Sequence, residues 1–269
     1  MSRPLRFVIC LAVSAVFVLP LFAMVVVVFT LRELVFDGGA SLWPSRFTTA
    51  NFSNLFASFP VWRWFSNAMI VATLTTALSV AVNLAAGFAL AKLQFAGRTV
   101  VLLIVLSTLM VPAQAVMIPQ FELVARMGLI GLFWAVILPS ASTALGVFLA
   151  RQFFVSVPDE LLDAARLDGC GTWATLRYVV LPMAKPLIAV MVLLAFMTQW
   201  NDFLWPLITL RDPDLYTLPV ALRFLQGQFD ADYGGLMAMA LLLSCVPLLV
   251  VFVALQRFFV DGFSRSGIR

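Results

Sequence analysis

The chain has 269 residues, of which 63% are hydrophobic and 11% are charged. Soluble domains carry about a quarter charged residues, so this composition excludes a soluble globular protein and predicts an integral membrane protein. The net charge of +4 comes from basic residues scattered between apolar blocks, a pattern that favours membrane orientation over nucleic-acid binding.

Long charge-free runs mark the expected membrane spans, and each predicts an α-helix because a span must satisfy its backbone hydrogen bonds internally. The first run resembles a signal peptide, but it is too long for a usual signal core and shows no obvious small-residue cleavage site. We interpret it as a retained first helix. The sequence therefore predicts one all-α domain over 1–269 with six spans, at about 7–31, 64–91, 99–121, 127–150, 185–210 and 233–256.

The distribution of Lys and Arg predicts how the chain is oriented in the bilayer, because basic residues are enriched on the cytoplasmic side. With both termini on one side, that side holds 11 of the 17 basic residues and the other side holds 6. We therefore predict that both termini, the 92–98 loop and the segment 158–182 are cytoplasmic.

The segment 158–182 is a charged stretch in an otherwise apolar sequence, and its first half predicts a short helix. Pro158 suits the first helical position, and the carboxylates of Asp159 and Glu160 suit the first turn, where they interact favourably with the helix dipole. Gly169 is well placed to end this helix in the left-handed conformation.

The second half of the same segment predicts a turn and a second helix. Gly171 allows a sharp turn, Thr172 is placed to cap a helix over 173–180, and Pro182 ends that helix or bends it into the next span. From local physics alone, a solvated amphipathic loop on the lipid headgroups is as good an interpretation as a docking surface.

The residue spacing within 158–182 matches a known pattern, and this resemblance favours the docking surface. Asp163-Ala164-Ala165 is followed after three residues by Gly169, and after nine more by the run Val179 to Pro182. This pattern resembles the EAA loop in the membrane subunits of bacterial ABC importers, with Asp in place of Glu at 163 and Val in place of Ile at 179. The segment 158–182 is called the coupling loop below.

Three further motifs extend the resemblance over nearly the whole chain. They are FLARQFF at 148–154, WNDFLWP at 200–206 and QRFFVDG at 256–262. They are similar to motifs of the carbohydrate-uptake permeases, the subfamily that includes the smaller membrane subunit of the maltose transporter.

The resemblance implies that the coupling loop docks into a cleft on a cytoplasmic ATPase and receives the motion driven by ATP. Asp163 is then the best candidate for an ion pair with a basic residue of that ATPase. The C-terminal tail is a weaker contact candidate, through Arg257, Gly262 and Arg265. The loop residues expected to take part are Glu160, Asp163, Ala164, Ala165, Arg166, Asp168, Gly169, Leu181 and Pro182.

The resemblance also implies the partners. These are a second homologous permease subunit in a heterodimer, two cytoplasmic ATPase subunits and an extracytoplasmic solute-binding protein, in the bacterial cytoplasmic (inner) membrane. The chain has no GxxxxGK[ST] phosphate loop, so ATP and Mg are expected on the partner ATPase and no cofactor on this chain. It is not expected to be an enzyme, and it has no histidine to serve as a metal ligand.

Asp202 is the only acidic residue inside an apolar run, which makes it a candidate for the transport path. The neighbours Gln199, Trp200, Asn201 and Trp205 suit sugar recognition, since aromatic faces stack on sugar rings and amides bind hydroxyls. The alternative is that Asp202 caps or kinks its helix or pairs with a partner subunit, while the tryptophans anchor the membrane interface.

Other polar residues within spans allow the same two interpretations. Asn83, Gln114 and Gln120 line a path or form helix–helix hydrogen bonds. Pro112 and Pro119 are expected to bend the third span.

The favoured function is therefore import of a sugar, oligosaccharide or polyol. An importer of glycerol-3-phosphate or a glycerophosphodiester is the alternative, although no basic residue lies within the predicted spans to attract a phosphate. A secondary transporter predicts internal repeats, which are not visible, and a membrane-embedded enzyme predicts convergent acids and bases, which are missing.

Overall fold

The computed structural model describes residues 3–30, 47–228, 235–236 and 238–241. Over these residues the chain is helical, and its β-type pairing is limited to one isolated bridge between Thr30 and Phe47. The helical elements are α1 (Arg3–Val28), α2 (Ala50–Ser58), α3 (Val61–Lys92), α4 (Arg98–Ser107), η2 (Thr108–Met110), η3 (Ala113–Val116), α5 (Met117–Arg126), α6 (Trp134–Ile137), α7 (Ala144–Val155), α8 (Asp159–Leu167), α9 (Thr172–Ala174), η4 (Thr175–Val180), α10 (Leu181–Met183), α11 (Lys185–Trp200), α12 (Leu204–Thr209), η5 (Pro213–Leu215) and α13 (Leu218–Gln228).

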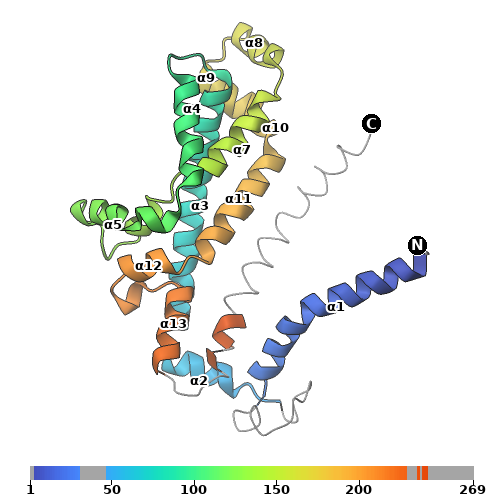
Figure 1. The fold of residues 1–269 in the computed structure, drawn as a ribbon, viewed down its shortest axis with the longest axis vertical. Coiled ribbons are helices and arrows are strands. Elements are labelled where there is room, and N and C mark those ends of the chain that lie inside the picture. Colours follow the sequence, from blue (N-terminus) through green and yellow to red (C-terminus); the bar gives the residue numbers. More distant parts are fainter. Residues whose placement is uncertain (1–2, 31–46, 229–234, 237, 242–269) are drawn as a thin grey trace.

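Helix α3 forms the axis of the fold, and α7 and α11 pack along it (Figure 1). Two glycines make the α3–α7 contact close. A Cβ atom at Gly87 would clash with Ala150, and one at Gly146 would clash with the side chain of Asn83. Small residues let helix backbones approach in this way when apolar burial alone provides little driving force, as in a membrane.

Helix α1 lies apart from this bundle over most of its length (Figure 1). Only 6% of its most apolar 18-residue window is buried, although its mean hydropathy is 2.8. An apolar helix that is exposed on nearly every side suits a lipid environment, where the surrounding solvent is itself apolar.

The predicted spans appear in a more broken form than expected. Two described helices, Phe7–Val28 and Val61–Lys92, are long and apolar enough to cross a membrane. Two bent pairs raise the number to four if each pair is one span: Arg98–Met110 with Ala113–Arg126, bent by 103°, and Thr172–Met183 with Lys185–Trp200, bent by 85°. The predicted sixth span, 233–256, lies mostly outside the described residues.

The third span shows the bend expected from its prolines. Pro112 lacks an N–H group and disfavours a helical conformation at the preceding residue. Val111 accordingly has φ −90° and ψ 120°, and the helical run stops there.

The prediction of one continuous helix over 127–150 was wrong. The chain forms turns at Gly128 and Gly131, both with positive φ, then the short α6, and α7 begins only at Ala144. Thr143 caps α7 by accepting a hydrogen bond from the backbone of Gly146 at 3.1 Å. The span over 185–210 is divided at 201–203, between α11 and α12, where the run of apolar residues is interrupted by Asp202.

Candidate functional site

The first helix of the coupling loop, α8, buries one face and exposes the other. Leu162 and Ala165 are buried, and Leu162 joins an apolar cluster with Phe88, Phe154 and Leu176. The helix begins at Asp159, so Pro158 holds the cap position and not the predicted first helical position. Asp159 and Glu160 lie in the first turn, as predicted. The remaining predicted docking residues of α8 and its end are exposed: Glu160, Asp163, Ala164, Arg166, Asp168 and Gly169.

The predicted left-handed end of α8 is confirmed. Gly169 has φ +82°, and its backbone N–H donates to the carbonyl of Arg166 at 3.0 Å. The N–H of Cys170 donates to the carbonyl of Ala165 at 2.9 Å. This pair of hydrogen bonds is the Schellman motif. A β-branched residue at position 169 would be strained, because such residues rarely adopt a positive φ.

The second helix of the loop differs from the prediction. It begins at Thr172, so Gly171 rather than Thr172 holds the cap position, with an ordinary φ of −70°. The hydroxyl of Thr175 instead donates to the carbonyl of Gly171 at 3.1 Å. The helix passes through the π-helical η4 and continues beyond Val180 to α10, so the exposed Pro182 lies inside it and the half-buried Leu181 begins α10.

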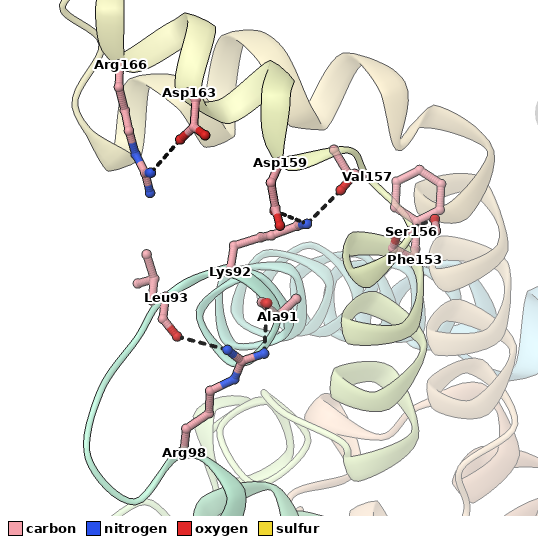
Figure 2. Close-up of polar contacts among 10 residues, drawn as sticks. All are labelled: Ala91, Lys92, Leu93, Arg98, Phe153, Ser156, Val157, Asp159, Asp163 and Arg166. Carbon is pink, nitrogen blue, oxygen red and sulfur yellow. Dashed lines mark hydrogen bonds and ion pairs between the residues drawn. The ribbon is translucent and has the colours of Figure 1, made fainter.

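Lys92, the last residue of α3, ties this helix to the start of the coupling loop (Figure 2). Its Nζ atom donates to the carbonyl oxygen of Val157 and to Oδ1 of Asp159, both at 2.6 Å. The Lys92 side chain is only 7% exposed, whereas that of Asp159 is 79% exposed. The hydrogen bond and the positive charge of Lys92 lower the pKa of Asp159 below its usual value.

Arg98 closes the same end of α3 from the start of α4 (Figure 2). Its Nε atom donates to the carbonyl of Leu90 at 2.7 Å, and a terminal nitrogen donates to that of Ala91 at 2.8 Å. The last carbonyls of a helix have no partner within the helix, so a guanidinium there satisfies them. Arg98 thus joins the start of α4 to the end of α3, whereas Lys92 joins that end to the coupling loop.

Asp163 already has a partner within its own helix. It forms an ion pair with Arg166 at 2.8 Å, and both side chains are more than half exposed (Figure 2). An exposed pair one turn apart is worth only a few tenths of a kcal/mol, so it can exchange for another partner at little cost.

A cavity of about 580 Å³ lies between α3, α11, the start of α7 and the segment around η3. Its wall is mainly apolar in area but includes several uncharged polar residues, and the expected path residues Asn83, Gln114 and Gln120 are among them. The polar wall also includes residues that the sequence analysis did not single out: Thr75, Ser79, Ser140, Ser142, Thr143 and Thr198.

The structure divides the residues predicted around Asp202. Gln199, Asp202 and Trp205 line the cavity. Trp200 is buried elsewhere, stacked on Phe196 with ring centroids 5.7 Å apart.

Asn201 also lies away from the cavity. It is exposed, and its side-chain amide donates to the carbonyl of Met197 at 2.8 Å. Asp202 additionally interacts with the backbone N–H groups of Trp205, Leu204 and Phe203. Asp202 thus lies at the cavity and close to the backbone N–H groups at the start of α12.

One signal for the missed residues was present in the sequence. Thr75, Ser79 and Asn83 are four residues apart, which places them along one stripe of a largely apolar helix. The predicted tail residues Arg257, Gly262 and Arg265 lie outside the described residues.

Residues 83–265 match the family of binding-protein-dependent transport system inner membrane components. The chain belongs to this family. The predicted ABC importer permease subunit is thereby confirmed, and this family is one of membrane permeases rather than enzymes.

Curated relatives extend over most of the chain. It is 35% identical to the arabinooligosaccharides transport system permease protein AraQ of Halalkalibacterium halodurans, over 88% of this chain and 82% of the relative. It is 36% identical to the lactose transport system permease protein LacG of Rhizobium radiobacter, over 82% of this chain and 81% of the relative. It is 29% identical to the sn-glycerol-3-phosphate transport system permease protein UgpE of Shigella flexneri, over 94% of this chain and 92% of the relative.

A solved structure shows the same fold. A bacterial ABC transporter involved in the import of the acidic polysaccharide alginate superposes with a TM-score of 0.82 over 96% of this chain and 99% of that one. The sequence identity is 24%, so this likeness carries the fold alone.

Proposed function

We propose that this chain forms half of the translocation path of a binding-protein-dependent importer for an uncharged sugar, oligosaccharide or polyol. The observation that carries the proposal is the cavity between α3 and α11, whose mainly apolar wall includes several residues with hydroxyl and amide groups and no basic residue. Such groups bind sugar hydroxyls. The permeases for arabinooligosaccharides and lactose among the relatives support the same substrate class.

The proposal includes the arrangement in the membrane. Six spans place both termini and the coupling loop in the cytoplasm, in agreement with the distribution of basic residues. A second homologous permease completes the path, and a solute-binding protein delivers substrate from the other side. Two ATPase subunits bind the ATP and Mg, since this chain has no phosphate loop.

The coupling loop is the contact with the ATPase in this proposal. Helix α8 buries Leu162 and Ala165 toward its own subunit, which leaves the acidic face with Glu160 and Asp163 directed outward. An acidic face is complementary to a basic cleft, and the Asp163–Arg166 pair is weak enough to open when a basic partner approaches.

Glycerol-3-phosphate is a second candidate substrate, because the UgpE relative spans 94% of this chain. Its phosphate requires positive charge nearby, and no Lys or Arg lines the cavity formed by the described residues. The cavity therefore favours the uncharged sugar.

Reconstitution of the complete transporter in proteoliposomes tests the proposal. The chain, its second permease, the ATPase and the binding protein are purified together, and ATP-dependent uptake of labelled lactose, arabinotriose and glycerol-3-phosphate is measured. We expect uptake of a neutral sugar. Uptake of glycerol-3-phosphate without any neutral sugar would contradict the substrate class, and a chain that transports without an ATPase would contradict the mechanism.

A further inference from the structure

Of the three helices that form the central bundle, α3 is the one that the chain does not join directly to the coupling loop. Helix α7 ends at Val155, just before the loop, and α11 begins at Lys185, just after it. Helix α3 ends at Lys92, which is 65 residues before Val157 in the sequence. A movement of the loop therefore reaches α3 through non-covalent contacts.

The side chain of Lys92 provides the polar part of these contacts. Its Nζ atom donates to the backbone carbonyl of Val157 and to the carboxylate of Asp159, which lie on the two sides of Pro158 (Figure 2). One ammonium group thus holds the chain on both sides of the start of α8. Because the Lys92 side chain is nearly buried, a loop that moved away would leave its charge without a partner, which is costly.

The ion pair on the outer face of α8 has the opposite character. Asp163 and Arg166 belong to the same helix, and both side chains are more than half exposed. Water replaces either partner at little cost, so this pair neither connects two elements nor resists separation. The two acidic residues therefore differ in position: Asp159 is bound to α3, whereas Asp163 lies on the surface that we assign to the ATPase.

Apolar packing supports the Lys92 link but does not replace it. Phe88 of α3 belongs to the same buried cluster as Phe154, Val157 and Leu162, and its ring meets that of Phe154 edge to face at 5.7 Å between centroids. A cavity of about 150 Å³ interrupts the packing between the end of α3, α8 and the start of α9, and Phe88, Lys92 and Leu162 are among the residues that line it. Apolar contacts are non-directional, and a void beside them lets side chains shift. The packing alone therefore does not fix the start of the loop relative to α3.

We propose that Lys92 is the positioning residue that makes the end of α3 move as one unit with the coupling loop during transport, a role that rests on the proposed function. The ATPase then acts on α7 and α11 through the chain itself and on α3 through this ammonium group. Helix α3 carries Thr75, Ser79 and Asn83 on the wall of the larger cavity, so a change at the loop reaches that wall along α3.

Sugar uptake per ATP hydrolysed, measured with the complete transporter in proteoliposomes, tests the link. Labelled lactose and arabinotriose are the probes. Lys92→Met removes both hydrogen bonds and should lower this ratio at least about threefold, because α3 is then held to the loop by apolar packing alone. Asp159→Asn keeps the contact with Val157 and should lower the ratio less. The double variant should match Lys92→Met, because both changes act on one contact.

Arg98→Met is the matched control for a general loosening of the end of α3. Arg98 donates to the carbonyls of Leu90, Ala91 and Leu93, and none of these acceptors belongs to the coupling loop. This variant should lower the thermal stability of the complex and leave uptake per ATP within about twofold of wild type. Equal losses in Arg98→Met and Lys92→Met would overturn the proposal, since any loosening of α3 would then be sufficient.

A cross-link tests whether the two residues stay together through the transport cycle. The three native cysteines are replaced by serine, and Lys92→Cys and Asp159→Cys are joined by a short thiol-reactive cross-linker. Because the two positions are expected to move as one unit, the cross-linked transporter should show a higher uptake per ATP than the same protein before cross-linking. Loss of transport on cross-linking, with ATP hydrolysis retained, would mean that the loop and α3 move apart, and the proposal would be wrong.

The results separate this role from the proposed function. If wild type takes up a sugar and Lys92→Met keeps the wild-type ratio, Lys92 only stabilises the fold and the sugar importer stands. If wild type takes up glycerol-3-phosphate and no sugar, the substrate class is wrong. The same ratios measured with glycerol-3-phosphate then still decide the role of Lys92.

Discussion

The coupling-loop end and the middle of α3 use polar residues in opposite ways. At the end, Lys92 carries a full charge that is satisfied by Val157 and Asp159. In the middle, Thr75 and the facing Gln199 are uncharged and have groups without partners among the described residues. Satisfied charges hold two segments in a fixed relation, whereas a buried neutral group without a partner is unfavourable for folding.

Helix α3 carries both the polar residues of the cavity wall and Lys92 at the coupling loop, so it connects these two regions. Thirteen residues separate Ser79, in the cavity wall, from Lys92, at the loop, a distance of about 20 Å along an α-helix. If the loop moves with an ATPase, as we propose, α3 is the element that connects it to the cavity wall, and Lys92 is the attachment.

The largest effect is expected at Gly169. Gly169→Val places a β-branched residue at φ +82°, which should disrupt the end of α8, abolish uptake and weaken ATPase association. Co-purification of the ATPase and proteoliposome uptake measure this. Gly171→Val is the matched control, because Gly171 has φ −70° and open space around its Cβ position. Normal transport by Gly169→Val would refute the assignment of the coupling loop.

Lys92→Met should have the next largest effect, because it keeps the length of the side chain and removes its charge. The carbonyl of Val157 and the carboxylate of Asp159 lose their shared donor, which loosens the junction between α3 and the coupling loop. We expect ATP hydrolysis to continue while uptake per ATP falls several-fold. Lys92→Arg should restore much of the coupling. A parallel fall in hydrolysis and uptake would indicate only lost assembly.

A smaller effect is expected from pH. The pKa of Asp159 is lowered in the folded protein by the hydrogen bond and charge of Lys92, so its contribution to stability is present above the usual aspartate pKa of about 3.9. That contribution is lost as the pH falls through the lower, folded-state value. The difference in thermal stability between wild type and Asp159→Asn should be constant from pH 5 to 8 and shrink below pH 4. A difference that is independent of pH would rule out the charged interaction.

The smallest change in stability is expected for Asp163→Asn. The exposed pair with Arg166 contributes about 0.5 kcal/mol or less, so the melting temperature should hardly move. If Asp163 contacts a basic residue of the ATPase, the same variant should still weaken ATPase association measurably. Loss of stability without loss of association would reverse our interpretation of this residue.

The sequence predictions were accurate for features that depend on neighbouring residues and failed for contacts between residues far apart in the sequence. The end of α8 at Gly169 was predictable, because the cap depends on neighbouring residues and on glycine's access to positive φ. The contact between Lys92 and Asp159 was not, because 67 residues separate them and several acids of the loop were equally plausible partners. The hydrophobic runs indicated membrane segments, but where those helices break depends on local prolines, glycines and their packing.

The candidate path shows the same limit on a smaller scale. Asp202 stood out because a carboxylate in an apolar run is costly and therefore informative. Its neighbours could not be sorted from sequence, because α11 ends at Trp200 and the chain then changes direction. In the structure, Gln199 lines the cavity, Trp200 is buried elsewhere and Asn201 is exposed.

The sequence by itself determined the class of the protein, the position of the coupling loop and the need for glycine at 169, because composition, spacing and backbone conformation act over short stretches of chain. Only the tertiary structure decided that Lys92 holds the loop and that Thr75, Gln199 and Asp202 share one cavity. Those relations arise where distant helices pack, and packing depends on the shapes of all the contacting side chains at once.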